Sequence, residues 1–317
     1  MTRRSHRAQR GAALLTAMII VTLVATLASA MIWQQWRAVQ IEIAERGRLQ
    51  SAWILSGALD WAKLILREDA KSGRPTALTE PWATPLAEAR LSTFLAADKD
   101  NTDDGPEAFL SGSITDAQSR YNLRNLVDPE NKIPAVEVTG LRSLFQAIDL
   151  QPEMADRIAR GLRDALAPPG TPETPSNPPL MPQTVVQLAW LGIDPESIRK
   201  MTPYVVLLPR ATPVNINTAS KEVLLTAIAG LDLGTAQRLV QVRQRAPFKE
   251  VADAQQHLPQ GITAAAPRAD VRSSFFEVRG RLRLADRVLE ESSLVERRGT
   301  DVPVTLTRQR ENSRESS

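Results

Sequence analysis

AALLTAMIIVTLVATLASAMIW, residues 12–33, contains no Asp, Glu, Lys or Arg. As an α-helix this stretch would be about 33 Å long at about 1.5 Å per residue. That length is enough to cross a hydrocarbon core about 30 Å thick. The segment before it carries four arginines, which are Arg3, Arg4, Arg7 and Arg10. Positive residues stay on the cytoplasmic side of a membrane, so we expect one membrane-spanning helix with a cytoplasmic N-terminus and the remaining chain on the other side.

Three interpretations of this segment compete. A cleaved secretory signal is one, because Ala28-Ser29-Ala30 has the small-x-small form that precedes signal-peptidase cleavage. A plain membrane anchor is the second. The third is a prepilin leader, a short basic stretch that ends at Gly11 and is removed before the apolar run. We favour the third, because the apolar run continues through residues 31–33 and passes into an amphipathic helical pattern over residues 34–70.

The prepilin interpretation divides the N-terminal region into three parts. Residues 1–11 are the leader, residues 12–33 the transmembrane segment, and residues 34–70 an amphipathic continuation of the same helix. Cleavage between Gly11 and Ala12 would make Ala12 the mature N-terminus. One long helix that is apolar at its start and amphipathic later is typical of type IV pilin-like subunits.

Four short motifs make the comparison with pilin-like proteins specific. They are residues 10–15 (RGAALL), 114–123 (ITDAQSRYNL), 214–220 (VNINTAS) and 275–278 (FFEV). In this order they resemble the type II secretion system minor pseudopilin K family over nearly the full length. The resemblance implies an α+β fold: a long N-terminal helix, a pilin-like head with an antiparallel sheet, and a large inserted all-α domain with a helix-hairpin-helix-like unit.

The same resemblance implies how the head is divided along the chain. Residues 71–133 would form the first part of the pilin-like body, and residues 134–267 the inserted α-domain. Residues 268–307 would supply the last strands. We expect residues 308–317, which are mostly charged and polar, to be a disordered tail.

Thr16 is the candidate assembly residue. Most pseudopilins carry a glutamate at the fifth mature position, where it pairs with the N-terminal amine of a neighbouring subunit. Counted from Ala12, that position is Thr16, and the K subunit is similar in lacking the glutamate. A carboxylate at membrane depth is costly without a partner, so its absence indicates the most distal subunit. From residue type alone, Thr16 is one of several small residues in a transmembrane helix.

The resemblance also implies a function, a location and partners. We expect a minor pseudopilin at the tip of the type II secretion pseudopilus, supporting its assembly and length control during export of folded proteins from the periplasm. The protein would be a single-pass inner-membrane protein with a periplasmic head. Its expected partners are the other minor pseudopilins at the tip, the major pseudopilin, the prepilin peptidase and the inner-membrane secretion platform, but not nucleic acid.

Residues 214–251 support a rival function, because they resemble a helix-hairpin-helix unit. Such units bind phosphate through glycine-rich hairpins, and an anchored DNA-binding or DNA-uptake protein is the alternative. Here the hairpin reads Gly230-Leu231-Asp232, with a carboxylate in place of the second glycine. Four basic residues follow, and we assign them to a solvated helix surface: Arg238, Arg243, Arg245 and Lys249. We therefore expect a packing module without a phosphate site.

Nothing in the sequence assembles a catalytic site. The only histidines are His6 and His257, and there is no cysteine. No Ser/His/Asp or Cys/His arrangement and no zinc-ligand spacing can be built from these residues. The net charge of +3 is too small to indicate nucleic acid. We expect a protein that is not an enzyme.

Calcium is the one metal to consider. An acidic run offers four weak candidate ligands, which are Asp98, Asp100, Asp103 and Asp104. This run lacks the distal glutamate of an EF-hand, so a solvated turn is favoured. In the K family an acidic loop of the α-domain often binds calcium, but here only Asp164 and the later Glu173 offer carboxylates. Calcium needs six to eight oxygen ligands, so we expect no cofactor.

Overall fold

The computed structural model describes residues 8–91, 108–167, 177–284 and 287–314. Helix α1 (Ala8–Lys71) opens the chain. The chain divides into two units, residues 1–56 and residues 57–317.

The first unit consists of the N-terminal part of α1. Within the described residues α1 is the one helix long and apolar enough to cross a membrane, with a mean hydropathy of 2.3 over its most apolar window. Its hydroxyls bond to carbonyl oxygens of the preceding turn. Thr22 Oγ1 donates to Ile19 at 2.9 Å, and Ser29 Oγ donates to Ala25 at 2.8 Å. The polar groups of the apolar stretch are thus satisfied internally, as a lipid environment requires.

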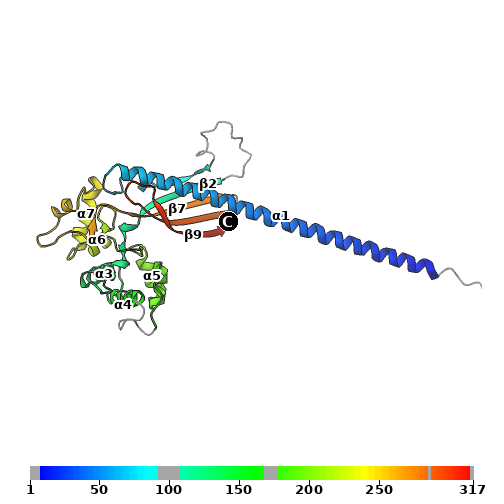
Figure 1. The fold of residues 1–317 in the computed structure, drawn as a ribbon, viewed down its shortest axis with the longest axis horizontal. Coiled ribbons are helices and arrows are strands. Elements are labelled where there is room, and N and C mark those ends of the chain that lie inside the picture. Colours follow the sequence, from blue (N-terminus) through cyan, green and yellow to red (C-terminus); the bar gives the residue numbers. More distant parts are fainter. Residues whose placement is uncertain (1–7, 92–107, 168–176, 285–286, 315–317) are drawn as a thin grey trace, which may run out of the picture. The chain divides into compact units, whose positions relative to one another are not determined.

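The second unit is built on an antiparallel sheet of five strands in the order β1-β2-β7-β8-β9 (Figure 1). The strands are β1 (Leu86–Arg90), β2 (Ala108–Asp116), β7 (Phe275–Leu284), β8 (Arg287–Glu296) and β9 (Val304–Arg314). The central pair joins distant parts of the sequence, because β2 lies beside β7 with Asp116 opposite Phe276.

One face of this sheet is covered by the last turns of α1. Leu59, Ala62 and Leu66 follow helical spacing and are buried. Strand β7 alternates from Phe276 onward: Phe276 and Val278 are buried toward the helix, and the more exposed Glu277 and Arg279 alternate with them. The shared apolar core consists of Leu59, Ala62, Leu66, Trp82, Ile114, Phe276, Val278 and Val295.

Strand β9 corrects one prediction. The tail predicted to be disordered from residue 308 onwards is in fact part of this strand as far as Arg314. Arg308 and Arg310 both form ion pairs with the buried Glu291 of β8, at 3.2 and 2.5 Å. A charged segment joins the sheet here because the neighbouring strand supplies its counter-ion.

Between β2 and β7 the chain forms a helical insertion. Its helices are α3 (Ala135–Ala147), α4 (Met154–Leu166), η4 (Val185–Leu191), α5 (Pro195–Met201), α6 (Lys221–Ala227), α7 (Leu233–Arg245) and α8 (Val251–Gln255). The insertion also contains two short pairs of parallel strands. They are β3 (Tyr121–Asn122) with β4 (Val205–Val206), and β5 (Val214–Asn215) with β6 (Ala269–Asp270).

The core of this insertion extends beyond the predicted bounds of 134–267. Its buried residues begin at Tyr121 and end at Val271. Tyr121 also donates to the buried Glu137 at 2.9 Å, and Arg268 forms an ion pair with the same carboxylate at 3.0 Å. The two flanks of the insertion are therefore packed and bonded as part of it.

Candidate functional site

The predicted processing and assembly residues all lie in α1. Gly11 and Ala12 are helical. Thr16 Oγ1 lies 3.0 Å from both the Ala12 and Ala13 carbonyl oxygens, to which it can donate. Position 16 therefore presents a neutral hydroxyl that is satisfied within its own helix. It needs no cationic partner from another chain.

The four calcium candidates, Asp98, Asp100, Asp103 and Asp104, lie outside the described residues, as does Glu173. Asp164, at the end of α4, accepts two hydrogen bonds from its neighbour Arg163, at 3.0 and 2.7 Å. Within the described ranges no three His, Cys, Asp or Glu side chains gather in a way that could hold a metal ion.

In the helix-hairpin-helix-like unit, α6 and α7 are joined by a turn in which Gly230 has a φ of +76°. That left-handed conformation suits glycine. Asp232 is the N-cap of α7, with Oδ1 accepting from the Thr235 amide at 2.9 Å and Oδ2 from its hydroxyl at 2.6 Å. The two Thr235 hydrogen bonds lower the pKa of Asp232. The helix N-terminus, where an anion would bind, is thus occupied by the protein's own carboxylate.

Arg243 is not on a solvated surface, which corrects the sequence prediction for this residue. Its side chain is buried and donates to the Ile216 carbonyl oxygen. Burial lowers the pKa of Arg243 to about 10. By contrast, Arg238, Arg245 and Lys249 are exposed as predicted. One of the four basic residues therefore holds the unit together from inside.

A buried polar junction, centred on Asp116, connects the sheet to the insertion. Asp116 Oδ2 accepts hydrogen bonds from Asn215 Nδ2 at 3.0 Å and from the hydroxyls of Thr218 and Ser273, both at 2.6 Å. Its other oxygen, Oδ1, accepts from the Gln118 amide at 2.8 Å. Burial raises the pKa of Asp116, and these four donors oppose the rise. The donors come from segments that precede and follow α6 as well as from the end of β2.

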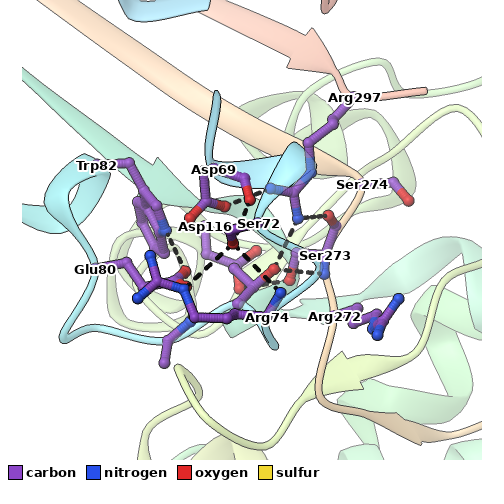
Figure 2. A network of polar contacts seen from close by, with 12 residues as sticks. Asp69, Ser72, Arg74, Glu80, Trp82, Asp116, Arg272, Ser273, Ser274 and Arg297 are labelled. Carbon is purple, nitrogen blue, oxygen red and sulfur yellow. Dashed lines mark hydrogen bonds and ion pairs between the residues drawn. The ribbon is translucent and has the colours of Figure 1, made fainter. Parts of the chain in front are cut away.

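Arg297 continues the junction toward α1 (Figure 2). It donates to Asp69 Oδ2 at 2.7 Å, to Thr76 Oγ1 at 2.7 Å and to the Ser273 carbonyl oxygen at 2.8 Å. Its guanidinium also lies 4.8 Å from the centre of the Phe276 ring. One largely buried cation therefore links the end of α1, the loop after it and the segment just before β7.

Two amides complete the arrangement. Gln118 Oε1 accepts from the Ser274 amide at 2.6 Å, while its Nε2 donates to Pro213 at 3.1 Å. The Asn217 side chain exchanges a pair of 2.9 Å hydrogen bonds with the main chain of Phe248. The polar residues of the hairpin motif are thus used for internal bonds.

The junction brings together three of the motifs quoted from the sequence, 114–123, 214–220 and 275–278. Sequence reasoning missed the contributions of Asp69, Thr76, Ser273 and Arg297. Ser273 and Ser274 carried a signal, since two small polar residues stand directly before an apolar strand. We find no comparable signal for the pairing of Arg297 with Asp69, because such contacts depend on the tertiary fold.

Comparisons with known proteins bear on the same regions. Two family models match the insertion, both described as type II secretion system (T2SS), protein K: one covers residues 119–210 and the other residues 214–272. Relatives named type II secretion system protein K match over most of their length. The Klebsiella pneumoniae protein is 29% identical, covering 96% of this chain and 97% of the relative. The Pseudomonas aeruginosa protein is 28% identical, covering 89% and 87%. The chain is similar to type II secretion system protein K over nearly its full length.

The fold agrees with this similarity to protein K. A chain in the crystal structure of the GspK-GspI-GspJ complex from the enterotoxigenic Escherichia coli type 2 secretion system matches with a TM-score of 0.64. The match is 20% identical in sequence and covers 85% of this chain and 99% of the other. The α+β fold and the predicted family are both confirmed.

For function, the similarity to protein K places the chain among the structural components of type II secretion, as a pseudopilin whose apolar N-terminal helix fits a membrane anchor. Nothing in the comparisons supports the DNA-binding alternative.

Proposed function

We propose that this protein is the minor pseudopilin that occupies the tip of the type II secretion pseudopilus, where it supports fibre assembly and limits fibre length. Its head would lie in the periplasm and its N-terminus in the cytoplasm, with α1 crossing the inner membrane. It would act as a structural subunit and not as an enzyme.

The fold match to a chain of the GspK-GspI-GspJ complex carries this proposal, since it covers nearly all of that chain. Two features of this protein support it. Thr16 offers no charge to the amine of a subunit above it. The helical insertion between β2 and β7 also adds bulk to one end of the head, which would hinder stacking of a further subunit on it.

Processing and assembly would depend on the N-terminal segment. We propose that the prepilin peptidase cleaves between Gly11 and Ala12 and that the freed helix packs with those of the other minor pseudopilins. The major pseudopilin and the inner-membrane platform would then engage the same helix bundle.

The test is to express the protein together with the prepilin peptidase and the counterparts of GspI and GspJ from the same cell. Mass spectrometry should find a mature chain that begins at Ala12, and the three subunits should co-purify. A Gly11→Leu variant should keep its leader and fail to restore secretion. A mature chain that begins at Met31, or a protein that purifies without the other two subunits, would contradict the proposal.

A further inference from the structure

Two acidic side chains are buried together where the loop after α1 folds back on the helix. Asp69 belongs to the last turn of α1, and Glu80 precedes the short helix η1 (Pro81–Ala83). Each side chain is only 6% exposed. Buried carboxylates need hydrogen-bond donors or cations, so each oxygen of these two groups should have a partner.

Asp69 is satisfied on one side only. Its Oδ2 accepts the 2.7 Å hydrogen bond from Arg297. Its Oδ1 is inaccessible to solvent and has no hydrogen-bond partner. An acceptor left in this state lowers stability, so a donor for Asp69 Oδ1 is expected within the protein.

The Glu80 carboxyl group is the candidate donor for Asp69 Oδ1. Its Oε2 accepts from Trp82 Nε1 at 2.9 Å and from the Ala77 amide at 3.2 Å. Its Oε1 forms a long ion pair with Arg74, whose Nε atom is 3.9 Å away and whose side chain is 64% exposed. The Glu80 carboxyl group lies within hydrogen-bonding reach of Asp69.

We propose that Glu80 is protonated in the folded protein and donates this proton to Asp69 Oδ1, so that the two side chains latch the loop of residues 74–83 onto α1. The proton supplies the partner that Asp69 Oδ1 otherwise lacks. Burial, and then the charge of Asp69, raise the pKa of Glu80, while the Trp82 and Ala77 hydrogen bonds oppose the rise. When two carboxyl groups lie side by side, repulsion between their charges raises the pKa of one of them, and the pair then shares one proton.

The latch lies beside a cavity of about 430 Å³ between α1 and the loop after it. Trp61, Leu64, Pro81 and Trp82 line it together with Asp69. When Glu80 loses its proton, its negative charge on the loop faces the negative charge of Asp69 on α1, and both segments contribute residues to the lining of this cavity. A rise in pH would therefore weaken the contact between the loop and α1 at this side of the cavity.

Three charged groups face Glu80 and set its response. Asp69 opposes ionisation, and Arg74 favours it from a distance. Arg297 donates its hydrogen bonds to Asp69, Thr76 and the Ser273 carbonyl group. The exposed Glu68 pairs with Lys71 at 2.7 Å and takes no part. Among these charged groups, the one that favours ionisation of Glu80 is thus the exposed Arg74, 3.9 Å away.

The direction of the pH effect follows from linkage. The folded protein binds the proton more tightly than the unfolded chain, because the pKa of Glu80 is raised on folding. The stabilisation is complete at pH values below the ordinary range of glutamate. It is lost as the pH rises through the raised pKa.

The experiment measures thermal unfolding of the full-length protein in detergent micelles from about pH 4 to about pH 8, which brackets the pKa range of a raised glutamate. The variant Glu80→Gln keeps the shape of the side chain, and its amide can donate to Asp69 at every pH. The matched control Glu130→Gln changes an exposed glutamate. The unfolding midpoint of Glu80→Gln should rise relative to the wild type as the pH rises, while the control should follow the wild type. Asp116 is present in all three proteins, so its own titration cancels.

Two outcomes would overturn the proposal. If Glu80 is ionised and paired with Arg74, then Glu80→Gln and Arg74→Gln will both lower the midpoint at neutral pH by similar amounts. A difference between Glu80→Gln and the wild type that does not vary with pH would also contradict it.

Hydrogen exchange provides a test on the wild type itself. After correction for the intrinsic exchange rates, the amide exchange of residues 74–83 reports how often this loop opens. This opening should increase with pH in the wild type and not in Glu80→Gln. Equal exchange in both proteins would refute the latch.

Discussion

Ser273 Oγ donates a 2.6 Å hydrogen bond to Asp116 Oδ2 across a sequence separation of 157 residues. Asp116 ends β2 and Ser273 stands just before β7, so this bond joins the two points where the chain leaves the sheet and returns to it. The entire helical insertion lies between them. A junction of this kind lets a pilin-like sheet carry a large insertion without separating its two central strands.

The first prediction concerns Asp116. Its two oxygens accept from four donors, so Asp116→Asn must turn one amide N–H group toward another donor. A buried donor left without an acceptor costs about 1–3 kcal/mol, and the free energy of unfolding should fall by at least that amount in urea titrations. Asp301→Asn, at an exposed position, is the control and should stay within about 0.5 kcal/mol of the wild type. Equal stability of the two variants would show that the junction does not hold the head together.

The second prediction compares two arginines of the same helix. Arg243→Met removes the donor to the buried Ile216 carbonyl group, whereas Arg245→Met changes an exposed side chain two residues further on. The first variant should lose about 1–3 kcal/mol of unfolding free energy. The second should be nearly neutral. If both were neutral, the buried position of Arg243 would contribute nothing to the hairpin unit.

The burial of Arg243 could have been predicted. Ala236, Leu239 and Arg243 recur at helical spacing, and all three face the core of the insertion. Charge suggested a solvated side chain, but periodicity indicated the buried face. The same periodicity is why the apolar part of α1 could be recognised directly, since its signal is continuous and local.

Strand β9 could not be predicted in this way. Residues 308–314 are charged or polar, and such composition indicates disorder when it is considered alone. The strand forms because the backbone of β8 pairs with it and because Glu291 binds two of its arginines. Both causes depend on a register between strands that only the folded sheet defines. The polar junction has the same origin: Asp116, Asn215 and Thr218 belong to the quoted motifs, but their contacts depend on the tertiary fold.

The third prediction concerns calcium. Asp164 bonds to Arg163, and no group of three potential ligands forms within the described residues. Thermal melts of the protein with excess calcium and with chelator should therefore coincide. A ligand at about 100 times its dissociation constant would add about 2.7 kcal/mol of stability. A midpoint that rises clearly with calcium would direct attention to Asp98, Asp100, Asp103 and Asp104, which alanine substitution would test one by one.

The last prediction concerns Thr16 and tests the proposed tip position. At the tip, the fifth mature side chain meets lipid or neighbouring helices and no ammonium group from a subunit above. Thr16→Glu would then gain no ion pair and would incur a cost on the order of 2.5–3.5 kcal/mol for a charge at the helix centre. Protonation of the carboxyl group softens this cost, so secretion should be unchanged or reduced.

Thr16→Val is the matched control. The Thr16 hydroxyl bonds only to carbonyl groups of its own helix, so its replacement by a methyl group should leave assembly intact. Both variants can be compared by the amount of secreted protein and by immunogold labelling of fibres. A subunit within the shaft would respond in the opposite way, because the amine of its neighbour would pair with the new charge. Longer fibres with Thr16→Glu protein distributed along them would therefore rule out the tip position.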